Sequence, residues 1–142
     1  MLLRNALIAA LLLAGNVSQA RSEGDSSLRI QRNLKLGGAE TYDLTCISDT
    51  SCSLKKTRGE AVIQTRAIKT GKKIIDSFTR EIAAFAKTPN GPVPAVQPTF
   101  EWRAENDGKN LTGHTLSETS DPQESRTLRT FESWLYLELS SQ

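Results

Sequence analysis

Residues 28–36 read Leu-Arg-Ile-Gln-Arg-Asn-Leu-Lys-Leu, and the alternation of apolar and polar side chains in this stretch decides the fold class. Successive side chains of a β-strand point to opposite faces of the sheet, so the pattern predicts a half-buried strand. Four apolar side chains would share its buried face: Leu28, Ile30, Leu34 and Leu36. Gly37 and Gly38 break the pattern, and a second strand follows with apolar positions at Tyr42, Leu44 and Cys46. The two segments predict an antiparallel hairpin.

An amphipathic helix is predicted over residues 72–87. Its apolar side chains recur at spacings of three and four and therefore form one stripe: Ile74, Ile75, Phe78, Ile82, Phe85 and Ala86. Thr70 is the candidate N-cap, and Pro89 followed by Asn90 and Gly91 ends the helix. Because only one side of this helix is apolar, it must cover an apolar surface, and the buried face of the strands is the available partner.

Further strands extend the predicted sheet. A third strand is predicted over about residues 52–57 and a fourth over residues 61–68, whose apolar members are Val62, Ile63 and Ile68. Residues 88–99 hold four of the five prolines and predict an extended, polyproline-like crossing. A strand then starts at Phe100, turns at Asn106-Asp107-Gly108-Lys109 and returns over residues 111–116.

The C-terminal segment favours a second helix. Asp121, Pro122 and Glu124 form a helix-start pattern, and apolar residues follow at helical spacing: Leu128, Phe131, Leu135 and Leu139. Residues 134–139 also alternate as a strand would, and that alternative stays open. The whole pattern predicts an α+β fold, an antiparallel β-meander of about four to six strands packed against one or two amphipathic helices.

The N-terminus predicts a cleavable secretory signal over residues 1–20. A basic start at Arg4 precedes the apolar run Ala6–Ala14, and Ser18-Gln19-Ala20 supplies small residues for cleavage. The nine-residue run is short for a membrane span, although an uncleaved N-terminal anchor is the alternative. We therefore expect a secreted or periplasmic protein with no transmembrane segment after cleavage, a loose lead over residues 21–27 and one domain over residues 28–140.

Cys46 and Cys52 are the two cysteines of the chain, and an oxidising compartment favours a disulfide between them. The turn-forming residues between them place the bond at the end of a hairpin. A redox-active dithiol or a metal pair is the alternative, but the spacing is wider than Cys-x-x-Cys and the chain has one histidine. We expect a structural disulfide and no metal or cofactor.

Catalytic motifs are not recognisable in this sequence. No Gly-x-Ser-x-Gly elbow accompanies His114, and no phosphate-binding glycine loop is present. Glu101 and Glu105 are candidate carboxylates for a glycoside-hydrolase mechanism, although such residues at strand edges are usually only solvated. Asn110-Leu111-Thr112 matches a glycosylation sequon beside the predicted turn.

Charge is distributed unevenly along the chain, whose formal net charge is +2. Residues 51–90 carry nine basic and three acidic side chains, whereas residues 91–142 carry four basic and eight acidic ones. Six cations form a candidate patch for an anionic partner: Lys55, Lys56, Arg58, Lys69, Lys72 and Lys73. Alternatively, the two halves neutralise one another within the fold or the cations are only solvated.

These observations favour an exported, non-enzymatic binding or interaction module, with an inhibitor-like role as one form of it. The expected partner is an acidic protein or an anionic envelope polymer rather than nucleic acid, because the cations lack interleaved aromatic residues. Two other functions stay open: a small secreted hydrolase that uses carboxylates, and a structural, envelope-associated protein without a dedicated ligand.

Overall fold

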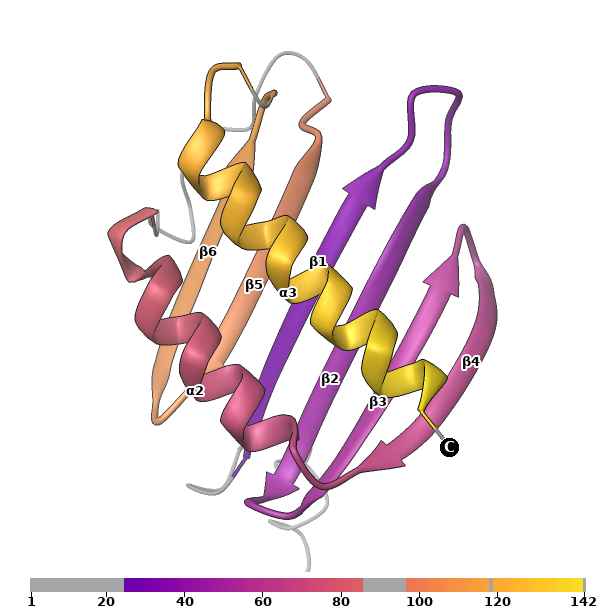
Figure 1. Cartoon of the computed structure of the whole chain (residues 1–142), viewed down its shortest axis with the longest axis vertical. Helices are drawn as coiled ribbons and strands as arrows, with labels where there is room; N and C mark the ends of the chain where they lie inside the picture. The colour runs from indigo at the N-terminus through magenta and orange to yellow at the C-terminus, as the bar shows by residue number, and fades with distance from the viewer. Residues whose placement is uncertain (1–24, 86–96, 118, 142) are drawn as a thin grey trace, which may run out of the picture.

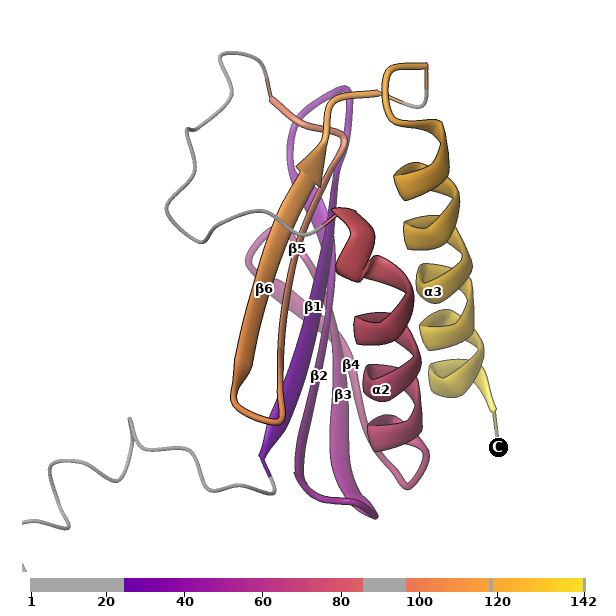
Figure 2. The same ribbon diagram turned by 90° about the vertical axis from the view of Figure 1, so that its left-hand side faces the viewer.

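A six-stranded antiparallel sheet with two helices on one face forms the structure (Figures 1 and 2). The computed structural model describes residues 25–85, 97–117 and 119–141. The elements are β1 (Ser26–Asn33), β2 (Ala39–Ser48), β3 (Ser51–Arg58), β4 (Ala61–Ile68), α2 (Gly71–Ile82), the 3-10 turn η1 (Ala83–Phe85), β5 (Phe100–Asn106), β6 (Lys109–Thr115) and α3 (Pro122–Ser140). The predicted α+β fold with a β-meander is confirmed.

The strand order is β4-β3-β2-β1-β5-β6. The first four strands form the meander, in which each strand pairs with its sequence neighbour. The chain then crosses the sheet as α2, and β5 pairs with the free side of β1 before β6 completes a second hairpin. Strands β1 and β5 are therefore adjacent although about seventy residues separate their partners, as in the pair Ile30 and Trp102.

The first strand is shorter than its sequence pattern predicts. Leu28 and Ile30 are buried as expected, but β1 ends at Asn33 and Leu36 is fully exposed. The cause is a backbone turn, in which the Leu34 amide donates to the Gly38 carbonyl and the Gly37 amide donates to the Leu34 carbonyl. The prediction that Leu34 and Leu36 share the buried face is wrong. Strand β1 also includes Ser26 and Ser27, which were predicted to belong to the lead.

The first helix agrees with its predicted apolar stripe. Ile74, Ile75, Phe78 and Ile82 are all fully buried, and Phe85 in η1 packs against them at half burial. Thr70 is the N-cap residue, and its carbonyl accepts hydrogen bonds from the Lys73 and Ile74 amides. The Thr70 side chain forms no capping hydrogen bond. Residues 86–87 of the predicted helix, most of the 88–99 crossing and the predicted signal lie outside the described residues.

Residues 122–140 form the helix α3, so the strand alternative for residues 134–139 is wrong. Its four predicted apolar positions, Leu128, Phe131, Leu135 and Leu139, are all buried. Glu124 in the first turn is also buried, and its Oε2 accepts a 2.8 Å hydrogen bond from Trp102 Nε1. This bond joins α3 to β5 and satisfies the indole donor inside the core.

Two glycines allow close packing on the covered face of the sheet. A Cβ on Gly71 would lie 2.6 Å from the Sγ of Cys52, and a Cβ on Gly113 would lie 2.5 Å from the Trp102 ring. The core between the layers contains edge-to-face contacts of Phe78 with Trp102 and with Phe131, at centroid distances of 5.5 and 5.1 Å. The covered face of the sheet is therefore tightly packed.

Other sequence predictions agree with the structure to within a few residues. The turn before β6 places Asp107 and Gly108 at positive φ, 51° and 81°, as an Asp-Gly hairpin turn requires. Strand β6 begins at Lys109 and ends at Thr115, slightly earlier than predicted. In β4, Ile68 is buried, whereas Val62 and Ile63 are exposed. Among the described residues, no helix combines the length and apolar character needed to cross a bilayer.

Candidate functional site

Both helices of the described residues, α2 and α3, lie on one face of the sheet, and we call the opposite face the open face (Figure 2). Strand alternation assigns side chains to it: Leu28 and Ile30 point to the helices, so Arg29 and Gln31 between them point to the open face. The register then carries this assignment across all six strands. The same strands therefore present two chemically different surfaces.

A row of four charged side chains crosses the open face on neighbouring strands. Asp43 of β2 lies between Lys55 of β3 and Arg29 of β1, and Arg29 is in turn opposite Arg103 of β5. We call Lys55, Asp43, Arg29 and Arg103 the charged row. The Arg29 Nε lies 3.6 Å from Asp43 Oδ1, with both side chains partly exposed. The row itself therefore holds three cations and one carboxylate, and Asp43 forms its ion pair with Arg29.

A depression of about 610 Å³ lies along part of this row. Its lining is dominated by hydroxyl and charged side chains: Arg29, Thr41, Asp43, Thr45, Ser53, Lys55, Thr57 and Thr65, together with Gly59. Hydroxyl groups can donate hydrogen bonds to anionic oxygens, and the lysine and arginine supply the charge. By strand register, the described part of the open face carries no Phe, Tyr or Trp. Its chemistry therefore suits a polar, anionic ligand.

The six cations predicted as one patch do not lie on one surface. Lys55 belongs to the open face, but Lys56 and Arg58 alternate to the helix side of β3. The Lys56 Nζ lies over the rings of Tyr42 and Tyr136, at 5.3 and 5.7 Å from their centroids. The side chains of Lys56 and Arg58 therefore lie on the covered side of the sheet.

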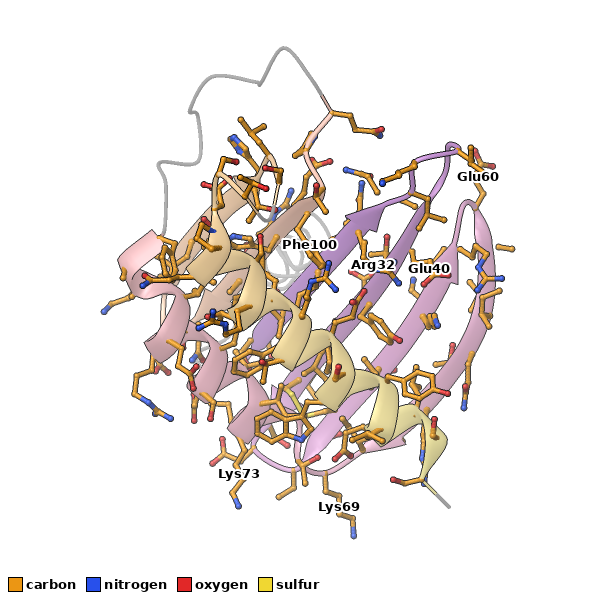
Figure 3. All side chains as sticks on the ribbon, turned by 45° about the horizontal axis from the view of Figure 1, so that its top comes forward. Arg32, Glu40, Glu60, Lys69, Lys73 and Phe100 are labelled. Atoms are coloured by element: carbon orange, nitrogen blue, oxygen red, sulfur yellow. A yellow bond between two sulfur atoms is a disulfide. The ribbon has the colours of Figure 1, made fainter. Side chains whose placement is uncertain are left out.

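The other three predicted cations lie at the start of α2. Lys72 is largely buried and forms ion pairs with Asp76 at 3.1 Å and Asp107 at 3.6 Å. Burial opposes the charged form of Lys72, but the hydrogen bonds and negative charges of Asp76 and Asp107 together outweigh burial and raise the pKa of Lys72. Lys69 and Lys73 are exposed and extend from one end of the molecule (Figure 3). Lys72 thus joins α2 to the β5–β6 turn.

Covered-side charges form a chain of ion pairs that fixes α3 to the sheet. Glu132 of α3 pairs with Arg32 at 2.9 Å, Arg32 with Glu40 at 3.1 Å and Glu40 with Arg58 at 2.7 Å. Figure 3 labels the two central residues, Arg32 and Glu40, on neighbouring strands. The hydrogen bond to Glu132 raises the pKa of Arg32. Burial opposes ionisation of Glu40, but the Arg58 hydrogen bond and the nearby cations outweigh it and lower the Glu40 pKa. These charges balance one another, unlike those of the charged row.

Tyr42 lies beside this chain of ion pairs on the covered face. Burial, followed by the nearby carboxylates of Glu132 and Glu40, raises the pKa of its phenol to about 12. The phenol therefore stays protonated at ordinary pH, and Tyr42 contributes a packed ring beneath Lys56 rather than an acid or base.

The predicted disulfide is present and joins opposite residues of β2 and β3. Cys46 is fully buried and Cys52 is 6% exposed, because the first turn of α2 covers them at Gly71. A bond enclosed in this way supports the packing of hairpin and helix, as expected for a structural role. Among the described residues, no cluster of three or more His, Cys, Asp or Glu side chains could hold a metal ion.

The carboxylates considered for hydrolysis lie on the open face but outside the depression. Glu101 is opposite His114, and its Oε2 accepts from Asn33 Nδ2 at 3.0 Å. Glu105 lies four positions further along β5, and Arg103 of the charged row lies between the two carboxylates. The depression itself is lined by one carboxylate, that of Asp43. A mechanism that uses two carboxylates would need a second acid at that place.

Sequence reasoning did not identify Arg29, Asp43 and Arg103 as members of the site. Strand alternation in the sequence places each of them on the polar side of its own strand, so their shared face could have been predicted. Their meeting depends on β1 lying between β2 and β5, which local patterns do not specify. Comparison with protein-family models, with curated proteins and with solved structures found no match to the chain.

Proposed function

We propose that the protein is an exported, non-enzymatic binding module whose open face holds an anionic polymer of the cell envelope. The charged row supports this proposal, because Arg29, Asp43 and Lys55 line a hydroxyl-rich depression and Arg103 continues the row beside it on β5. The predicted signal and the disulfide support an extracytoplasmic location. The predicted patch is thereby reduced to Lys55 and extended by Arg29 and Arg103.

We expect that folding does not require the cations of this row. Arg29 and Arg103 are directly opposite one another on β1 and β5, and like charges in that arrangement destabilise a sheet. Both side chains are exposed, so the cost is small. A bound anion would turn this repulsion into attraction, which is the expected behaviour of a surface shaped for an anionic ligand.

A polymer fits this face better than an acidic protein does. Protein interfaces usually gain most of their affinity from a few buried aromatic or arginine anchors set in pockets. The described open face offers hydroxyl groups and cations in a broad depression, without aromatic anchors. Repeated weak contacts with anionic groups along a chain would make use of such a surface.

Binding to defined probes tests this function. Polyphosphate and poly-L-glutamate serve as anionic probes and dextran as the neutral one, measured by titration calorimetry at low salt. The variant R29Q/K55Q/R103Q should bind the anionic probes at least about tenfold more weakly than wild type. The matched control K69Q/K73Q/R80Q removes the same charge from exposed positions at α2 and should keep wild-type affinity.

Two results would contradict the proposal. Equal weakening by both triple variants would indicate general charge attraction, and equal affinity for dextran would indicate a neutral ligand. If neither polymer binds and a purified acidic protein binds through Arg29 and Arg103 instead, the partner class named here is wrong.

A further inference from the structure

The charges of the charged row follow a fixed order across the sheet: cation, carboxylate, cation, cation. Asp43 of β2 lies between Lys55 of β3 and Arg29 of β1, and Arg103 follows on β5. Neighbouring strands are about 4.8 Å apart, so the backbones at Lys55 and Arg29 are separated by roughly 9.6 Å. A polymer that crosses the strands along this row therefore meets a carboxylate midway between two cations.

The Asp43 carboxylate has the capacity to accept hydrogen bonds from a ligand. Its ion pair with Arg29 spans 3.6 Å, which is longer than a hydrogen bond, and its side chain is partly exposed. An ionised carboxylate offers about four acceptor sites and no donor. It would therefore repel an anionic group of a ligand, whereas a ligand hydroxyl could donate to it.

Hydroxyl side chains lie on both sides of Asp43 along the strands. Thr41 and Thr45 are the second residues before and after it on β2, and they are opposite Thr57 and Ser53 of β3. All four line the depression, and Thr41 is only 6% exposed, which places it at the floor. A hydroxyl group both donates and accepts, so a ligand that can only accept would use half of this capacity.

We propose that the polymer bound by the open face carries free hydroxyl groups between its anionic groups, as acidic polysaccharides and polyol phosphates do. This inference rests on the proposed function and specifies its ligand. The anionic groups would bind at Lys55 and at the pair Arg29 and Arg103, and hydroxyl groups between them would donate to Asp43. A polymer with a negative charge at every step would instead place a charge against Asp43, so Asp43 determines specificity.

Two pairs of polymers test this inference, because each pair shares its anionic group. Polygalacturonate and poly-L-glutamate both carry carboxylates, and poly(glycerol phosphate) and polyphosphate both carry phosphates. Only the first member of each pair carries hydroxyl groups. In titration calorimetry at one salt concentration, wild type should bind the hydroxyl-bearing member of at least one pair about fivefold more tightly. The pair with the larger preference identifies the anionic group.

The variant Asp43→Ala separates hydroxyl recognition from net charge. Loss of the carboxylate should raise the affinity for the hydroxyl-free polymer and reduce the preference within the pair to less than about twofold. The matched control Asp49→Ala removes a negative charge at the exposed turn between β2 and β3. It should leave the preference at its wild-type value, because a change of net charge alone acts on both members of a pair.

The outcomes distinguish this inference from the proposed function. Equal affinity within both pairs in wild type overturns the inference, as does a preference that Asp43→Ala leaves intact. Either result leaves the proposed function standing, since that function requires only that anionic polymers bind through the cations of the charged row. Failure of wild type to bind any of the four polymers overturns both.

Discussion

The two faces of one sheet differ in what their side chains do. On β1, Leu28 and Ile30 are buried against the helices, whereas Arg29 between them is exposed and meets Asp43 and Arg103 across the open face. The covered face has balanced ion pairs and close ring contacts, and the open face has the exposed charged row beside a depression lined mainly by polar side chains. Alternate residues of the same strands therefore form the packed core on one face and the exposed surface that we propose for binding on the other.

The largest effect is expected from opening a cavity on the covered face. Phe78 is fully buried between Trp102 and Phe131, so Phe78→Ala should lower the free energy of unfolding by about 3–5 kcal/mol. Thr45→Ala, an exposed position on the open face of β2, should change it by less than about 0.5 kcal/mol. Urea denaturation measures both. Equal losses of unfolding free energy in the two variants would contradict the proposed difference between the faces.

Removing the disulfide should have the next largest effect. The double variant Cys46→Ala/Cys52→Ala removes a cross-link that restricts the unfolded chain. Its free energy of unfolding should therefore be roughly 2 kcal/mol lower than that of wild type. Because the bond lies beneath Gly71, the loss should also loosen the first turn of α2, which hydrogen exchange at residues 73–76 would detect. Unchanged stability with and without reductant would show that the covered face does not depend on this bond.

A smaller, pH-dependent effect is expected from the ion pairs on the covered face. The pKa of Glu40 is lowered in the folded protein, so its contribution is present above the ordinary glutamate pKa and is lost as pH falls through the folded value. Between pH 7 and acidic pH, the free energy of unfolding of wild type should therefore fall by about 1 kcal/mol more than that of Glu40→Gln. Glu60→Gln, an exposed control, should follow wild type. Parallel curves for wild type and Glu40→Gln would contradict the assignment.

The smallest effect on stability should come from the charged row itself. The variant R29Q/K55Q/R103Q removes two like charges that oppose one another, so its free energy of unfolding should equal that of wild type to within about 0.5 kcal/mol. Thermal and urea denaturation measure it. A large loss would mean that the row stabilises the fold, and the proposed division between the two faces would then fail.

Sequence patterns predicted the covered face far better than the open one. Alternation at Leu28 and Ile30 and helical spacing at Ile74, Phe78 and Leu135 each report burial against one neighbouring layer, and burial is a property that periodicity records directly. The alternating pattern wrongly included Leu36 in the strand, because a backbone turn ends β1 at Asn33 and side-chain periodicity does not report that turn. Side-chain periodicity thus indicates which residues are buried, but it does not always indicate where strand pairing ends.

The candidate site required long-range information. Lys55, Lys56 and Arg58 are close in sequence and suggested one patch, yet alternation sends Lys55 to one face and its two neighbours to the other. Arg29 and Arg103 are far apart in sequence and meet because β5 returns to pair with β1. Only the strand order reveals that pairing, and no local propensity encodes it.

Mapping polymer binding onto the backbone by NMR tests the role of the open face. Wild-type protein is titrated with polyphosphate, and amide shift changes are followed residue by residue. We expect the largest changes on β1, β2, β3 and β5 around Arg29, Asp43, Lys55 and Arg103. Changes concentrated at Lys69 and Lys73, or spread evenly over all exposed cations, would contradict it.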